Sequence, residues 1–163
     1  MEVVLMIPKN NASARSLPAA KDFVRKKNWT ADGGVLSKKE ALEILRGKGL
    51  SIDSQYISFA NPSKAKKGTY WANPIAACLL HDWWLILNDE EERVLYVFCV
   101  PAKSIKKTDV VLRVRTVNDP VLLISVAIER KGSVFVDTRK KIVHFERYLV
   151  KTVRYVTRVN EAK

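Results

Sequence analysis

The chain has 163 residues, the length of one domain, and folding a chain of this size buries about 70% of the surface that its unfolded form exposes. Its 47% hydrophobic and 9% aromatic residues exclude the disordered class, because such a chain can bury an apolar core. Lysines and arginines number 29 against 17 acidic residues, which gives a formal net charge of +12 and a pI near 9.8. Such an excess is the electrostatic footprint of a nucleic-acid-binding protein.

The start of the sequence, the lack of a long apolar run and the cysteines lead us to expect an intracellular protein. The apolar start, MEVVLMIPKN, is too short for a signal peptide and has no basic region before it. Nothing in the sequence approaches the roughly 20 apolar residues that cross a bilayer. Cys78 and Cys99 stand in apolar surroundings, which favours buried thiols over a disulfide or a zinc site. We therefore expect a cytoplasmic protein with no membrane partner and no cofactor.

The first elements along the chain are predicted to be helices. Pro18 suits the first turn of a helix over residues 18–27. Ser37 and Glu40 have the spacing of a capping box that begins a second helix, and Gly47 ends it. A helix-turn-helix built from these two helices, with the following lysine-rich loop as its wing, is a minor alternative.

The remaining chain is predicted to be rich in strands, because its segments contain many β-branched and aromatic residues. The predicted strands cover residues 56–59, 83–88, 94–100, 110–117, 121–128 and 134–136, followed by a short helix over 144–150 and a last strand to 159. We therefore predict one α+β domain over 1–163, with a helical part at 1–50 and a sheet-rich part at 51–163. The sheet is expected to be mostly antiparallel and strongly twisted, with five to seven strands.

A lysine-rich loop precedes two adjacent aromatic residues. Lys64, Lys66 and Lys67 are too far along the chain from acidic residues to be paired locally, so we expect them to contact phosphates. For Tyr70 and Trp71, burial beneath the sheet is the favoured interpretation. Stacking on an unpaired base is the alternative.

Arginines share one face in two of the predicted strands. Side chains in a strand alternate between its faces, so Arg113 and Arg115 point one way, as do Arg154 and Arg158 in the last strand. We expect a continuous cationic sheet face that grips phosphates, of DNA rather than RNA. The predicted nucleic-acid contacts are Lys64, Lys66, Lys67, Tyr70, Trp71, Arg113, Arg115, Arg139, Lys140, Lys141, Arg154 and Arg158. A recognition role in a restriction or mobile-element system would fit such a module.

Three charged residues suggest an alternative, catalytic function. A hairpin about the turn at 118–119 would pair residues whose numbers sum to about 238, which places Asp109 opposite Glu129, with Lys131 on the same face. This set resembles the PD-(D/E)xK nucleases, although Thr108 stands where that family has proline. The resemblance implies that Asp109 and Glu129 would bind Mg²⁺ and that Lys131 would help to activate water.

A third interpretation is a protein-interaction module. Its basic groups would bind an acidic partner, and the acidic run at 89–92 would form a complementary or self-associating surface. In this interpretation a homodimer is one of the alternatives. The two histidines suggest little chemistry, because His81 follows an apolar stretch and is expected to be a hydrogen-bonded core residue.

Overall fold

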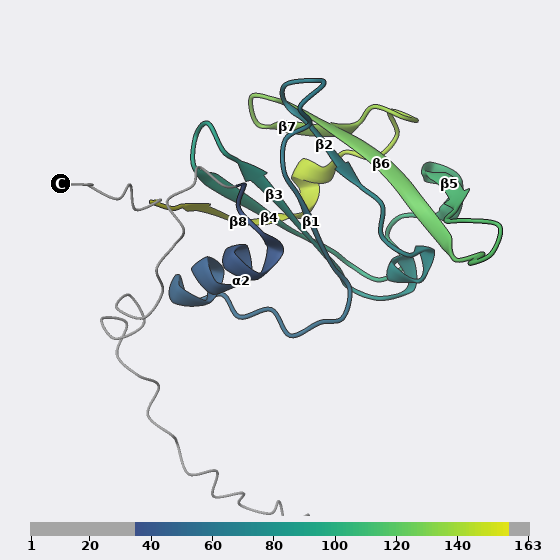
Figure 1. Ribbon diagram of the computed structural model, residues 1–163, viewed down its shortest axis with the longest axis horizontal. Helices are drawn as coiled ribbons and strands as arrows, with labels where there is room; N and C mark the ends of the chain where they lie inside the picture. The colour runs from purple at the N-terminus through teal and green to yellow at the C-terminus, as the bar shows by residue number, and fades with distance from the viewer. Residues whose placement is uncertain (1–34, 157–163) are drawn as a thin grey trace, which may run out of the picture.

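The computed structural model describes residues 35–156, which form three stacked layers (Figure 1). The only α-helix among these residues, α2 (Lys38–Gly47), packs on one face of a four-stranded sheet, sheet A. Sheet B covers the opposite face of sheet A. Sheet A has the strand order β1 (Ile57–Ala60), β3 (Trp83–Asp89), β4 (Val94–Val100) and β8 (Leu149–Arg154).

Sheet B is built around one long strand, β6 (Leu122–Lys131). β2 (Thr69–Ala72) pairs with one edge of β6. β5 (Val111–Val114) and β7 (Val134–Asp137) pair with different parts of the other edge. Three short 3₁₀-helices connect the strands: η1 (Ala76–Leu80), η2 (Lys107–Asp109) and η3 (Phe145–Tyr148). All strand pairs are antiparallel except β1 with β3.

The alternation of side chains along β3 and β4 produces two cores. Trp83 and Phe98 point toward sheet B, where their rings pack edge-on against Phe145. Ile86 and Val97 point the other way and pack beneath α2. Sheet A is therefore apolar on both faces, which explains why the β3 and β4 sequences are nearly continuous apolar runs.

The capping box predicted for the second helix is confirmed. The Ser37 hydroxyl accepts the N–H of Glu40 at 3.3 Å, and the Ser37 N–H donates to the Glu40 carboxylate at 2.7 Å. The buried residues Ala41 and Leu45 face sheet A one turn apart. The helix ends at Gly47, as the sequence predicts.

An ion pair joins the two sheets at one end of the core between them. The Arg130 guanidinium on β6 lies 2.7 Å from the Asp89 carboxylate at the end of β3. It also covers the Tyr96 ring at 4.8 Å and donates from Nε to the Gly132 carbonyl. Arg130 is therefore a structural cation rather than a free one.

The prediction of a mixed, mostly antiparallel α and β fold is confirmed, with two corrections. Eight strands form two sheets, where five to seven strands in one sheet were expected. The prediction of a helical N-terminal part is also wrong for the described residues, in which α2 is the one α-helix. The helix predicted over 18–27 lies outside the described residues. The helix predicted over 144–150 is the short η3, and β8 begins directly after it. No helix within 35–156 is long and apolar enough to cross a bilayer.

Candidate nucleic-acid interface

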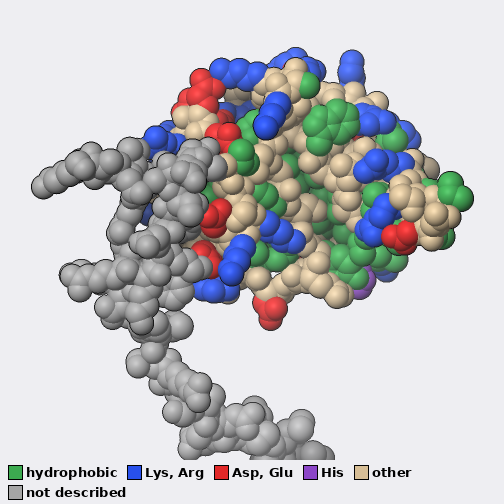
Figure 2. Space-filling model, in the orientation of Figure 1, with side chains coloured by type: hydrophobic (Ala, Val, Ile, Leu, Met, Phe, Trp, Pro, Cys, Tyr) green, Lys and Arg blue, Asp and Glu red, His purple; other side chains and the backbone are tan. Residues whose placement is uncertain are grey.

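The positive charge of the described chain is concentrated on sheet B. The strands of sheet B and their connections lie within residues 61–72 and 101–141. These two segments contain thirteen lysines and arginines and four acidic residues, which gives a net charge of +9. All the other residues within 35–156 contain eight lysines and arginines and nine acidic residues, which gives a net charge of −1. Figure 2 shows the result as Lys and Arg side chains along the upper and right-hand rim, where Figure 1 has β7, β2, β6 and β5.

Trp71 lies on the outer face of this basic sheet. Its strand, β2, turns Tyr70 and Ala72 into the core between the sheets, where they are 2% and 4% exposed. Trp71 points the opposite way, pairs with Ala127 of β6 and is 46% exposed. The burial predicted for Tyr70 is confirmed and that for Trp71 is wrong, because alternation along a strand places adjacent residues on opposite faces.

A guanidinium group lies over the Trp71 ring. Arg139 follows β7, and its Cζ is 5.6 Å from the centre of the ring. At this distance the cation and the π face attract each other. Its Nη1 also lies 3.4 Å from the hydroxyl of Ser125, a long hydrogen bond. The Arg139 side chain thus extends from the β7 side of β6 toward β2 and remains exposed.

A buried carboxylate positions the backbone that carries Arg139. Oδ1 of Asp137 accepts the N–H of Ala127 at 3.0 Å and the N–H of Arg139 at 3.1 Å. Thr138 donates both its N–H and its hydroxyl to the Ala127 carbonyl. These bonds fix the turn at 137–141 to the residue of β6 that pairs with Trp71.

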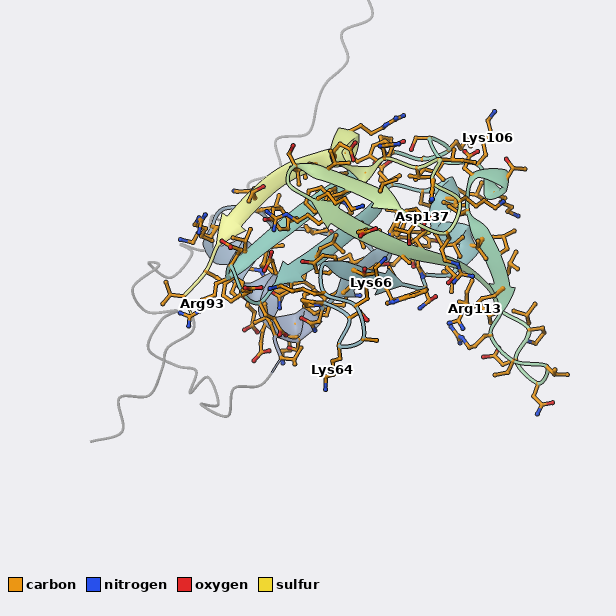
Figure 3. The ribbon with its side chains drawn as sticks, turned by 90° about the horizontal axis from the view of Figure 1, so that it is seen from above. Lys64, Lys66, Arg93, Lys106, Arg113 and Asp137 are labelled. Atoms are coloured by element: carbon orange, nitrogen blue, oxygen red, sulfur yellow. The ribbon has the colours of Figure 1, made fainter. Side chains whose placement is uncertain are left out.

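The β6 residues beside Trp71 have small side chains, and cations lie at both ends of this stretch of β6. Ser125 and Ala127 are turned away from the core between the sheets, but they are covered, at 3% and 2% exposed. Arg113 of β5 pairs with Leu123 at one end, and Lys66 lies 3.6 Å from Glu129 toward the other. The six residue-to-residue steps from Leu123 to Glu129 span about 20 Å. Figure 3 looks onto this face and shows Lys66 and Arg113 on either side of it.

The lysine loop has acidic neighbours that the sequence did not predict. Lys66 contacts Glu129, and Lys67 lies 2.7 Å from Glu91 of the β3–β4 turn. The hydrogen bond and the charge of Glu91 raise the pKa of Lys67. Lys64 has no ion-pair partner within 35–156 and points away from the molecule at the end of its loop (Figure 3). Exposed ion pairs of this kind exchange readily with solvent and leave the lysines accessible to phosphate.

The two arginine-bearing strands do not form one face, which corrects the predicted continuous surface. Arg113 lies on β5 of sheet B, and Arg154 lies on β8, the edge strand of sheet A. Arg115 follows the end of β5 and pairs with Asp119 at 3.1 Å. Arg158 lies outside the described residues. The two strands share an alternation of side chains, but no strand pairing joins them.

The remaining basic residues of the prediction lie in the turn that also carries Arg139. Lys140 donates from Nζ to the Thr108 carbonyl at 2.8 Å, which joins this turn to the segment before β5. Lys141 is exposed and has a positive φ of 58°. The turn thus adds two further cations to sheet B.

The three residues of the nuclease alternative occupy two separate places. Where β5 pairs with β6, the numbers of the paired residues sum to 236 rather than to 238. The predicted register is therefore wrong. Asp109 lies in η2, before β5 begins, and its carboxylate accepts the N–H of Lys106. Glu129 lies near Lys66 and is 3.7 Å from Lys131. Nowhere within 35–156 do three His, Cys, Asp or Glu side chains gather in a group that could hold a metal ion.

The histidines and cysteines lie outside the basic surface. His81 is exposed and stacks on Tyr56, with ring centres 4.4 Å apart, so the expected core position is wrong. His144 contacts Glu146 at 3.1 Å. Cys78 is buried, and burial raises the pKa of its thiol to about 12, whereas Cys99 is half-buried. Both thiols are free.

No protein-family model, curated protein or solved structure matches this chain. The candidate site is therefore defined by the residues of the chain alone. Sequence reasoning missed β2 and the contact between Trp71 and Arg139. The signal for β2 was the alternation in TYWA, in which Tyr70 and Ala72 share one face and Trp71 takes the other.

Proposed function

We propose that the protein binds nucleic acid, with DNA as the expected polymer, through the outer face of sheet B and the loops beside it. The observation that carries this proposal is the concentration of charge: +9 on sheet B and its connections against −1 on the rest of the described chain. Such an asymmetry attracts a polyanion to one layer of the molecule. The residues proposed to bind phosphate include Lys64, Lys66, Lys67, Arg113, Arg139, Lys140 and Lys141.

The proposed binding is dominated by phosphate contacts. Lysine and arginine side chains that neutralise phosphates release the counterions condensed on the polymer, so affinity falls steeply as salt rises. Arg113 and Arg139 are exposed and can offer bidentate hydrogen bonds to a phosphate. Contacts of this type hold and orient a strand but do not read its bases.

The two alternatives have less support in the contacts. A nuclease of the PD-(D/E)xK arrangement needs Asp109 near Glu129 and Lys131, and these residues belong to η2 and to the far end of β6. A module that uses the acidic run at 89–92 needs free carboxylates, and two of the four, Asp89 and Glu91, pair with Arg130 and Lys67. Plasmid incubated with Mg²⁺ and either wild type or Glu129→Ala tests the nuclease directly.

Two charge-matched triple variants test the proposal. The first carries Lys64→Glu, Arg113→Glu and Lys140→Glu, all on sheet B or its loops. The second carries Lys39→Glu, Arg46→Glu and Arg147→Glu, on α2 and η3. Both remove the same charge, so a difference between them reports position alone. Anisotropy of a fluorescein-labelled oligonucleotide at low salt measures the affinity.

We expect the sheet B variant to lose affinity by about tenfold or more, together with part of the salt dependence. The α2 and η3 variant should bind like wild type. Equal losses in the two variants would contradict the assignment to sheet B, and no binding by wild type at low salt would contradict nucleic-acid binding itself.

A further inference from the structure

The exposure of Trp71 is not explained by the packing of the fold. Both of its neighbours on β2 are buried in the core between the sheets, while the indole is 46% exposed on the opposite face. No other aromatic side chain of β2, β5, β6 or β7 points outward. An exposed tryptophan within a strand of the most basic layer is an aromatic surface available to a ligand.

The exposed part of this stretch is the indole itself. The β6 residues beside it, Ala127 and Ser125, have small side chains that are only 2% and 3% exposed, so a ligand on this face meets the Trp71 ring rather than β6. Unpaired bases stack on aromatic side chains that a sheet presents in this way, whatever their sequence, because every base has a π face. In a duplex the faces of the bases are covered by their neighbours, so a side chain on a flat sheet does not reach them.

The Arg139 guanidinium lies over the Trp71 ring, on which a base would stack. Its guanidinium is a planar group 5.6 Å from the centre of the ring. The side chain is exposed, and its one hydrogen bond to another side chain in the described part, to Ser125, is long at 3.4 Å. A phosphate offers the guanidinium two short, charge-assisted bonds in place of this contact. The Asp137 and Thr138 bonds to Ala127 keep Arg139 within reach of the ring.

Building on the proposed function, we propose that sheet B binds single-stranded nucleic acid and that one base stacks on Trp71. In the bound state the Arg139 guanidinium leaves the exposed face of the ring to the base and contacts an adjacent phosphate. Arg113 and Lys66 contact the backbone on the two sides of that base, at the two ends of the span along β6. The preference for single strands arises from Trp71, because the cations bind both forms.

The test compares wild type, Trp71→Ala and Trp71→Phe on three ligands. These are oligothymidylate and oligouridylate of about 15 nucleotides and a DNA hairpin duplex of similar length. Trp71→Ala should weaken binding to both single strands by about tenfold or more and leave duplex binding unchanged. Trp71→Phe should retain most of the affinity, since phenylalanine also stacks. Thermal unfolding of each variant checks that the fold is intact.

Salt and fluorescence provide two independent measurements. The loss caused by Trp71→Ala should be equal at 50 mM and 200 mM salt, because stacking releases no counterions. Oligothymidylate should quench the tryptophan fluorescence of wild type but not that of Trp71→Phe. Equal affinity of wild type and Trp71→Ala for single strands, or equal losses on single strands and duplex, would overturn this inference alone. No binding of any of the three polymers would overturn the proposed function as well.

Discussion

Glu146 is a carboxylate whose environment favours its charged form. Its Oε2 accepts the backbone N–H of Phe135 at 2.9 Å, and Oε1 lies 3.1 Å from Nδ1 of His144. Partial desolvation raises the pKa of Glu146, but the N–H groups of Phe135 and of Glu146 itself and the His144 ring together outweigh it. The pKa therefore lies below its ordinary value of 4.5.

A lowered pKa in the folded state predicts the direction of a pH dependence. The stabilisation by Glu146 is fully present above pH 4.5 and is lost as the pH falls through the native pKa. In urea titrations at several pH values, the free energy of unfolding of Glu146→Gln should therefore fall less over this window than that of wild type. Asp53→Asn, at an exposed carboxylate before β1, is the matched control. Parallel pH profiles for wild type and Glu146→Gln would contradict the assignment.

The position of Trp71 shows what a sequence predicts for a single residue. Its chemistry was evident, and stacking on a base was an open alternative, but its exposure depends on β2, a strand of four residues that pairs with a segment far along the chain. The partners of Lys66 and Lys67 were missed for a similar reason. Glu129 and Glu91 approach these lysines only once the strands have paired.

The turn at 137–141 is the element that connects the fold to the candidate site. Asp137 is fully buried, and one of its oxygens satisfies two backbone N–H groups, those of Ala127 and Arg139. Its other oxygen, Oδ2, has no hydrogen-bond partner in the described part of the chain. A buried carboxylate is costly, so its presence here is explained by these two bonds, one of which satisfies the Ala127 N–H in the gap between β5 and β7 along β6.

Removing this carboxylate should affect both stability and binding. Asp137→Ala leaves the N–H of Ala127 buried without an acceptor, which costs about 1–3 kcal/mol of the free energy of unfolding. It also frees the backbone of Arg139, so oligonucleotide affinity should decrease under conditions in which the variant remains folded. Asp119→Ala, at an exposed turn carboxylate, should leave stability within about 0.5 kcal/mol of wild type. Unchanged stability of Asp137→Ala would show that the turn does not depend on this residue.

Local signals predicted some elements well and others poorly. The start of α2 and the strands β3 and β4 follow from a capping box and from runs of branched and aromatic residues, which act within a few positions. The register of β5 with β6 depends on the turn between them, where Arg115 N–H donates to the Val121 carbonyl. A shift of two in the sum of paired residue numbers was enough to make the predicted opposition of Asp109 and Glu129 wrong.

At the scale of the whole molecule, the division into two sheets determines where charge lies. Period-two alternation explains why Val153 and Tyr155 are buried while Arg154 between them is exposed. It did not indicate that Arg154 and Arg113 belong to different sheets, because alternation describes a strand and not its neighbours. The net charge of +12 indicates a polyanionic partner, whereas the choice of sheet B as its binding surface requires the topology.

Lysine footprinting with a bound single-stranded oligonucleotide tests the location of the binding surface most directly. An amine-reactive reagent modifies exposed lysines, and mass spectrometry measures the rate at each position with and without the oligonucleotide. We predict protection of Lys64, Lys66 and Lys140, which lie beside sheet B, and unchanged rates at Lys39 and Lys48, on and just after α2. Protection at Lys39 and Lys48 without protection at the sheet B lysines would contradict the assignment of sheet B as the nucleic-acid interface.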